Sequence, residues 1–170
     1  MAENDNPEAT PAPEAAATDA TGQAPRFAIQ KLYLKDVSFE APGAPAIFQE
    51  SGDPELKLNL QQRVQPVGED LYEVVLTVTV TCTLGEKTAY LAEVQQAGVF
   101  GLNGFAQDQL QATLGAYCPT ILFPYARQQV SDLVAHGGFQ PLILQPVNFD
   151  QLYADQVRKR MEQGEAAGSA

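Results

Sequence analysis

Residues 72–100, YEVVLTVTVTCTLGEKTAYLAEVQQAGVF, decide the fold of this chain. In the first half of this stretch apolar and polar residues alternate, and a period of two is typical of a strand with one buried face. A four-residue interruption at 84–87, LGEK, precedes a second run at 88–96. Strands joined by so short a turn pair antiparallel, so the sequence predicts a β-hairpin. Leu91 and Glu93 share the outward face of the second strand, and we expect this face to meet a partner.

Length and charge limit the classes of protein to which this chain can belong. At 170 residues and 18.3 kDa it is long enough for one hydrophobic core and too short for two, so we expect one domain. Ten Lys and Arg against 21 Asp and Glu give a net charge of −11, which disfavours nucleic acid and anionic membranes as partners and favours a basic one. No apolar run has membrane-spanning length and no signal-peptide pattern is present, which predicts a cytoplasmic protein without membrane insertion.

The two ends of the chain differ from its middle in composition. Residues 1–25 hold Ala, Pro, Thr and five acids but neither Lys nor Arg. Such a segment buries too little apolar area to offset the entropy of ordering, so we predict that it is disordered. We expect the folded domain to occupy residues 26–163 and a flexible tail to follow at 164–170.

The segment 27–40, FAIQKLYLKDVSFE, also alternates and predicts a strand. Strict alternation places an apolar set on one face, namely Phe27, Ile29, Tyr33, Val37 and Phe39. The opposite face carries Asp36, Ser38 and Glu40. At roughly 3.3 Å per residue the two carboxylates lie about 13 Å apart, too far to share a proton as a catalytic pair. They form either an acidic docking face or an ordinary solvated face.

Two further segments lie between this strand and the hairpin. Residues 41–55 contain three prolines and two glycines, which predicts a long crossover loop. The apolar pair Ile47 and Phe48 within this loop must rest on another part of the protein. Residues 56–64 alternate again and predict a strand, with an inward face formed by Leu56, Leu58 and Leu60.

The region after the hairpin is predicted to be helical. Three glycines within 97–105 indicate the end of a strand and a bend, and apolar residues then recur at steps of three and four over 106–136, up to a Gly-Gly stop. Pro119 and Pro124 each remove an amide donor, so we expect a bend or break within 117–125. This stretch, YCPTILFPY, is almost wholly apolar and needs burial on two sides, by the sheet and by another subunit.

A last helix is predicted from Phe149 or Asp150 to Met161. Asn148 or Asp150 can cap its start, and the bases at 158–160 are expected to complement the negative end of its dipole. The preceding stretch, PLILQPVNF, contains two prolines and is expected to be an extended connector or an edge strand.

The residue inventory argues against catalysis. His136 is the only histidine and stands beside the Gly-Gly stop, where a polar residue caps a helix. Cys82 and Cys118 form no metal-ligand spacing and are expected to be buried thiols. Nucleophile elbows and phosphate-binding glycine loops are missing from the sequence. We therefore expect no enzyme and no cofactor, and the excess of apolar residues predicts an oligomer that binds other chains.

Four stretches resemble the SecB family of bacterial protein-export chaperones. They are YLKDVSFEAPGAPAIF at 33–48, the hairpin at 72–100, LGAYCPTILFPYAR at 114–127 and PVNFDQLY at 146–153. The resemblance implies an α+β fold, in which a four-stranded antiparallel sheet carries two helices on one face, assembled as a dimer of dimers. It implies an ATP-independent holdase that binds unfolded precursors of exported proteins, keeps them translocation-competent and delivers them to the SecA motor.

The resemblance also assigns roles to particular residues. It implies that the acidic sheet face contacts a basic region of SecA through Asp36, Glu40, Leu91 and Glu93. It implies a client groove between the crossover loop, the sheet and the last helix, walled by Tyr33, Phe39, Phe48, Leu56, Leu58, Tyr90, Leu142 and Tyr153. It places the oligomer interface at Ala92, Val94, Gln96, Tyr117, Cys118 and Ile121. Where some relatives carry a large aromatic residue this chain has Gly52, which implies a shallower groove or a looser loop.

Two other functions fit the same pattern. One is a SecB-like chaperone dedicated to a single client, such as a toxin-antitoxin module, which would rescue that client without binding SecA. The other is a small hotdog-like thioesterase, which also wraps a sheet around a long helix but needs an acid or His poised at a subunit interface.

Overall fold

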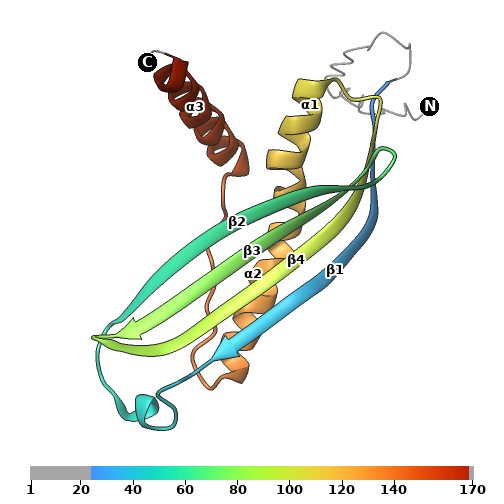
Figure 1. The fold of residues 1–170 in the computed structure, drawn as a ribbon. Coiled ribbons are helices and arrows are strands. Elements are labelled where there is room, and N and C mark those ends of the chain that lie inside the picture. Colours follow the sequence, from blue (N-terminus) through green and yellow to red (C-terminus); the bar gives the residue numbers. More distant parts are fainter. Residues whose placement is uncertain (1–23, 169–170) are drawn as a thin grey trace, which may run out of the picture.

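A computed structural model of the chain describes residues 24–168, and its centre is one antiparallel sheet (Figure 1). The strands are β1 (Arg26–Glu40), β2 (Pro54–Gly68), β3 (Leu71–Leu84) and β4 (Lys87–Asn103). They lie in the order β1-β4-β3-β2, so the predicted hairpin forms the middle of the sheet and β1 and β2 form its edges. The predicted four-stranded antiparallel sheet is confirmed.

Strand β4 is longer than the glycine pattern predicted. The strand was expected to end near residue 96, yet it continues to Asn103. A Cβ on Gly98 would lie 2.7 Å from the ring of Phe100, so this glycine makes room for a neighbouring ring rather than ending the strand. Phe100 is fully buried in the core beneath the helices.

Strand β1 departs from strict alternation, and this corrects the prediction for Tyr33. The pairing with β4 shifts twice, between Ile29 and Lys31 and between Leu34 and Asp36. Each shift inserts one extra residue, and an extra residue reverses the face of every side chain that follows it. Tyr33 lies between the two shifts and therefore points away from the helices, where its hydroxyl donates to Glu73.

The predicted long helix forms with an irregular first part. It consists of α1 (Gln107–Ala112), a π-helical turn η2 (Thr113–Tyr117) and α2 (Cys118–His136). The irregularity precedes the stretch in which the bend was expected, and α2 runs through Pro124 without interruption. Thr120 and Pro124 are both exposed, so water can replace the amide that the Thr120 carbonyl lacks.

The π turn is stabilised from the sheet. The N–H of Cys118 donates to the Thr113 carbonyl, five residues back. In the same register the next amide would donate to the Leu114 carbonyl, but Pro119 has no N–H to give. Gln62 of β2 takes that place, with its Nε2 donating to the Leu114 oxygen at 2.6 Å. The strand thus completes the hydrogen bonding of the helix.

The second helix of the predicted pair, α3 (Phe149–Gly168), follows an extended connector. Asn148 caps it, since its Oδ1 accepts a hydrogen bond of 3.0 Å from the Gln151 amide, as predicted. The predicted end at Met161 is wrong, and residues expected to form a flexible tail are helical as far as Gly168. Glu, Gln and Ala in EQGEAA are strong helix formers, and Gly164 alone opposes them at about 1 kcal/mol.

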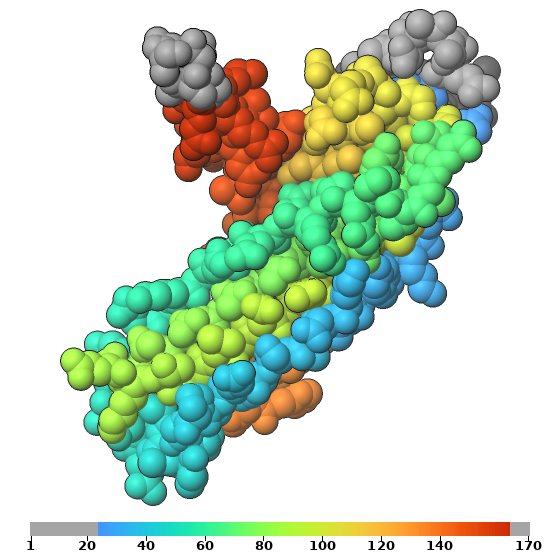
Figure 2. Space-filling view, in the orientation of Figure 1, coloured from blue at the N-terminus to red at the C-terminus, as the bar shows by residue number. Residues whose placement is uncertain are grey.

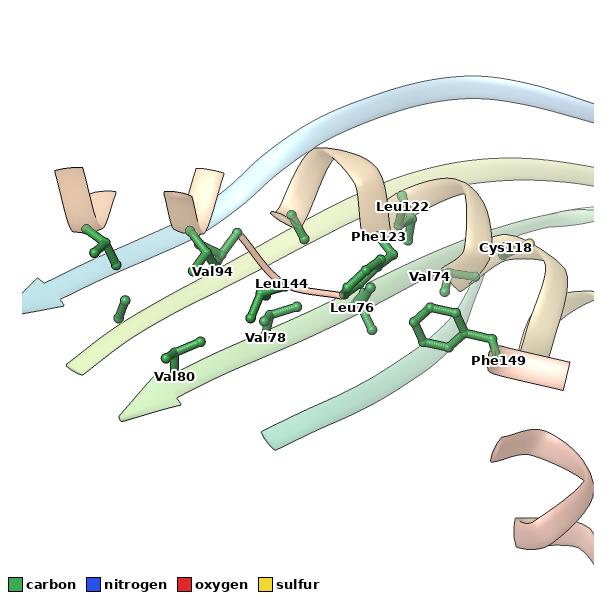
Figure 3. Packing of buried hydrophobic residues seen from close by; sticks show 14 of the residues in the cluster. Val74, Leu76, Val78, Val80, Val94, Cys118, Leu122, Phe123, Leu144 and Phe149 are labelled. Carbon is green, nitrogen blue, oxygen red and sulfur yellow. The ribbon is translucent and has the colours of Figure 1, made fainter. Parts of the chain in front are cut away.

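The core lies between α2 and the two central strands (Figure 3). Alternate side chains of β3 point toward α2 and are almost fully buried; they are Val74, Leu76, Val78, Val80 and Cys82. Leu122 of α2, Leu144 of the connector and Phe149 of α3 close over them. Cys82 and Cys118 are buried free cysteines, as predicted. Within residues 24–168 no helix is both long and apolar enough to cross a membrane.

Candidate functional site: an apolar hollow and an acidic sheet face

One surface hollow lies between the crossover loop, the far end of the central hairpin and the connector that follows α2. Its volume is about 620 Å³. Four of the predicted groove residues, Phe48, Leu56, Tyr90 and Leu142, line it together with Phe139. We call this surface the aromatic hollow, defined by these five residues.

The aromatic rings at this hollow touch one another. Phe139 stands in the middle, with ring centroids 5.1 Å from Phe48 and 4.9 Å from Tyr90. Phe39 stacks on Tyr90 at 5.9 Å, which ties β1 to the cluster. Phe48 is 51% exposed although it is packed against these rings, so one side of the cluster faces solvent. The hollow presents apolar faces that a bound chain can cover.

The C-terminal end of α2 places Phe139, which sequence reasoning missed. Gly138 has a φ of 86°, its N–H donates to the Ala135 carbonyl, and the Phe139 N–H donates to the Val134 carbonyl. This is a Schellman motif, in which the residue after the left-handed glycine makes an apolar contact. A phenylalanine directly after a Gly-Gly stop was the signal in the sequence that could have identified it.

Two further contacts hold the walls of the hollow. The short helical turn η1 (Ala46–Gln49) in the crossover loop buries Ile47, which is 3% exposed, and leaves the adjacent Phe48 outside. The prediction that the apolar pair rests on the body of the protein is confirmed by the burial of Ile47 and by the contact of Phe48 with the Phe139 ring. A Cβ on Gly137 would lie 2.1 Å from the Phe39 ring, so the end of α2 and β1 approach each other only because this residue is glycine.

Strand β2 extends the apolar surface beyond the hollow. Leu56 and Leu58 face the same side as the buried residues of β3, opposite Cys82 and Val80, yet each is 46% exposed. The core beneath α2 is formed by β3 and β4, so the outer strand lacks a cover. Exposed apolar side chains in a row beside an open hollow are typical of surfaces that bind an apolar partner.

Two of the predicted groove residues lie elsewhere. Tyr153 of α3 packs on the π turn, where a Cβ on Gly115 would lie 2.4 Å from its ring, and lines a different hollow. Tyr33 faces the other side of the sheet, and its assignment to the groove is wrong for that reason. Phe39, Phe48, Leu56, Leu58, Tyr90 and Leu142 lie on one continuous side of the sheet.

The chemistry available at the aromatic hollow is apolar contact. Burial raises the pKa of Tyr90 to about 12, with the neighbouring Cys82 contributing, so its hydroxyl is neutral at physiological pH. Burial also raises the pKa of the Cys82 thiol. Among the described residues no group of three or more His, Cys, Asp and Glu could hold a metal ion.

The opposite face of the sheet is open and carries the predicted acidic cluster. Figure 2 looks onto this face, and the helices within residues 24–168 lie on the other side of the sheet. Antiparallel pairing sets Asp36 beside Gln95, Ser38 beside Glu93 and Glu40 beside Leu91. The four predicted docking residues, Asp36, Glu40, Leu91 and Glu93, therefore lie together on adjacent strands. We call them the acidic face.

Glu93 is held in place at this surface. Its Oε2 accepts a hydrogen bond of 2.9 Å from Thr79 Oγ1 on the neighbouring β3. Asp36 and Glu40 are exposed and Glu93 is half-buried, so three carboxylates are available to one partner. Adjacent like charges of this kind attract a basic surface and accelerate its association.

A buried carboxylate on the same side of the sheet was missed by sequence reasoning. Glu73 is 4% exposed and accepts hydrogen bonds from Tyr33, from Lys35 Nζ at 2.5 Å and from Gln65 Nε2 at 2.6 Å. The bonds from Lys35 and Tyr33 hold the pKa of Glu73 below its usual value, and burial next to this carboxylate raises the pKa of Tyr33 to about 12. The signal in the sequence was the one acid among the threonines on the outward face of β3.

The predicted interface residues fall into two groups. Ala92, Val94 and Gln96 of β4 are buried within this chain, and Gln96 Nε2 donates to the Tyr33 carbonyl at 3.0 Å. Cys118 is also fully buried, which raises the pKa of its thiol to about 12. Tyr117 is 54% exposed and Ile121 is half-buried. Only the second group offers surface to another subunit, and the interface as a whole stays a prediction.

Comparison with known proteins identifies the family. The family model described as "Preprotein translocase subunit SecB" matches residues 20–160. The chain is 57% identical to the protein-export protein SecB of Stenotrophomonas maltophilia over 151 residues, covering 89% of this chain and 87% of the relative. It is 54% identical to that of Xanthomonas oryzae pv. oryzae over 162 residues, covering 92% and 95%.

A solved structure gives the same fold. A SecB-like chaperone of Mycobacterium tuberculosis, in complex with a peptide from an antitoxin, aligns with a TM-score of 0.60 at 19% identity, over 72% of this chain and 91% of that one. At this identity the likeness concerns the fold alone. The sequence matches are far stronger, and they show that this chain belongs to the SecB family of protein-export chaperones.

Proposed function

We propose that the protein is a holdase that binds unfolded precursors of exported proteins without ATP and keeps them competent for translocation. The observation that carries this proposal is the aromatic hollow and its continuation along the exposed Leu56 and Leu58. Apolar burial at about 25 cal/mol per Å² requires no particular hydrogen-bond pattern, so such a surface accepts many sequences. Folded proteins bury their apolar segments, and only unfolded chains expose them for long enough to bind.

We further propose that the acidic face binds a basic region of the SecA motor. Its support is the grouping of Asp36, Glu40 and Glu93 on the open side of the sheet, opposite the side that bears the hollow. A chaperone must hold its client while it meets the motor. Two sites on opposite sides of one sheet allow both partners to bind at once.

The proposed working form is a cytoplasmic homotetramer, a dimer of dimers. Tyr117 and Tyr125 on the long helix are 54% and 50% exposed, and Ile121 lies between them in sequence. Large apolar side chains in a row on one helix are typical of a surface that another subunit covers. Light scattering should give a mass of four chains, whereas the mass of one chain would contradict this assembly.

The proposed function is tested by two substitutions on the two sides of the sheet. Phe48→Ala removes an exposed ring of the hollow, and we expect weaker suppression of the aggregation of a denatured precursor with unchanged affinity for SecA. Glu93→Lys reverses one charge of the acidic face, and we expect the opposite pattern. Both activities are measured without nucleotide, on each variant and on the parent protein.

The pattern of losses decides the assignment of the two surfaces. Equal losses of both activities in each variant would contradict separate sites. Holding of one client only, with no affinity for SecA, would favour the single-client chaperone. The match to protein-export relatives at 54–57% identity, against 19% to the antitoxin-binding protein, supports the export function. The thioesterase hypothesis gains no support from the family match.

A further inference from the structure

The only run of consecutive basic residues in the sequence, Arg158, Lys159 and Arg160, has no role in the sites described above. It was expected at the end of α3, where it would complement the helix dipole, but the helix continues to Gly168 and the run lies in its middle. All three side chains are exposed. Arg158 forms an ion pair of 2.7 Å with Asp155, while Lys159 and Arg160 form none with the side chains that the structure describes.

Arg160 also lines a second hollow, which lies between α3, the π turn and β2. The volume of this hollow is about 680 Å³. Figure 2 shows the gap at this end of the molecule, where α3 stands apart from α1. Around Arg160 the wall carries the glutamines Gln61, Gln62, Gln111 and Gln156, and none of the described residues that line it is an acid. In a chain with a net charge of −11, a surface with amide donors, a cation and no acid selects an anionic ligand.

The same chain carries a segment of the complementary kind. Residues 1–23 hold five acids, Glu3, Asp5, Glu8, Glu14 and Asp19, and contain neither Lys nor Arg. The segment enters β1 at the end of the sheet where α1 and α3 lie (Figure 1). At about 3.4 Å per residue, twenty residues reach roughly 70 Å, which exceeds the diameter of a domain of this size. Tethering raises the local concentration of such a segment to the millimolar range.

We propose that the acidic segment 1–23 docks on the basic run of α3 and in the second hollow. There it competes with an unfolded client that follows the apolar row of β2 from Leu56 and Leu58 to Leu60, which lines this hollow. Its carboxylates pair with Lys159 and Arg160 and accept hydrogen bonds from the glutamine amides. The small Ala, Pro and Thr residues between the acids allow an extended chain to lie in the hollow. The competition with a client rests on the proposed holdase function, whereas the docking itself does not.

Cross-linking of the full-length protein tests the docking directly. A water-soluble carbodiimide joins a carboxylate to a lysine amine only when the two are in contact. We expect peptides from residues 1–23 to be linked to Lys159 in preference to Lys31, and we expect this link to fade at high salt. Lys31 is the matched control, because it is exposed and much nearer to the segment along the chain. A link to Lys31 that equals or exceeds the link to Lys159 would overturn the proposal.

A binding measurement tests the competition. In one variant the five acids become amides, Glu3→Gln, Asp5→Asn, Glu8→Gln, Glu14→Gln and Asp19→Asn; in another, Lys159→Gln and Arg160→Gln remove the basic partner. The ligand is a reduced and alkylated protein that stays unfolded. We expect each variant to bind it about two- to tenfold more tightly than the parent does. Because the acids and the bases act as one contact, combining the two sets of substitutions should give no further gain. Unchanged affinity in the first variant would overturn the competition. If neither the parent nor any variant binds the unfolded protein, the proposed holdase function is wrong. The cross-links would still show whether residues 1–23 dock on α3.

Discussion

The hydroxyl of Tyr33 on β1 donates to the carboxylate of Glu73 on β3, across the intervening strand β4. The contact exists because Tyr33 lies between two shifts in the pairing of β1, which turn it to the open side of the sheet. Lys35 and Gln65 complete the set of donors around Glu73. One buried carboxylate thus links the edge strand β1 to the centre of the sheet, on the side that carries the acidic face.

Glu73→Gln should lower the free energy of unfolding by about 1–3 kcal/mol, because it leaves Lys35 without its counter-charge and turns one acceptor into a donor that faces other donors. Lys35 is partly exposed, which keeps the loss below that of a fully buried ion pair. Urea denaturation measures this change in unfolding free energy. The protein concentration is held fixed, since the stability of an oligomer depends on concentration. The exposed Glu69→Gln is the control and should change stability by less than about 0.5 kcal/mol. Equal losses of stability in the two variants would show that the hydrogen bonds to Glu73 do not stabilise the fold.

The contribution of Glu73 should depend on pH with a definite sign. Its pKa in the folded protein lies below the value of 4.5 that it has when unperturbed, so folding favours the ionised form. The stabilisation is therefore complete above pH 4.5 and is lost as the pH falls through the lower pKa of the folded state. The difference in unfolding free energy between the parent and Glu73→Gln should be constant near neutral pH and shrink in acid. A difference that grows on acidification would contradict the depressed pKa.

Gly138→Ala should weaken both folding and client binding. At a φ of 86° an alanine is strained by about 1–2 kcal/mol, and its Cβ would lie 3.3 Å from the Phe48 ring. Gly85→Ala is the matched control, because Gly85 has a φ of 57° but no atom within 4 Å of the added Cβ. Both variants should lose stability in thermal unfolding, but only Gly138→Ala should bind a denatured precursor less tightly. Equal binding of the precursor by the two variants would mean that the position of the Phe48 ring does not depend on Gly138.

The parts of the fold that follow from hydrophobic patterning could be predicted from the sequence. The hairpin at 72–100 forms because its apolar face keeps a period of two and α2 covers that face. Alternation likewise placed Asp36 and Glu40 on one face of β1, whereas their grouping with Leu91 and Glu93 was implied by the resemblance to the SecB family.

The features that sequence reasoning missed depend on contacts between distant segments. The two pairing shifts of β1 leave an indirect mark in its sequence, because Lys31 and Lys35 occupy positions that strict alternation assigns to the apolar face. The shifts are stabilised by Glu73 on one side of the sheet and by Gln96 on the other, forty and sixty-three residues away along the chain. Extra residues in an edge strand become favourable only when such partners are present. The two lysines indicate that the alternation breaks, but they do not show at which residues the extra positions lie, so the face that Tyr33 occupies depends on these distant partners.

The last prediction concerns the π turn, whose hydrogen bonding depends on one side chain of β2. Gln62→Ala removes the donor to the Leu114 carbonyl, which Pro119 cannot replace. We expect a loss of about 0.5–1.5 kcal/mol in unfolding free energy and faster amide hydrogen exchange, confined to Thr113–Tyr117 and the adjoining start of α2. Gln61→Ala is the control, since Gln61 stands at the neighbouring strand position on the other side of the sheet and should leave exchange in the turn unchanged. Uniformly faster exchange along the whole of α2 would instead mean that Gln62 supports the packing of the helix rather than its irregular turn.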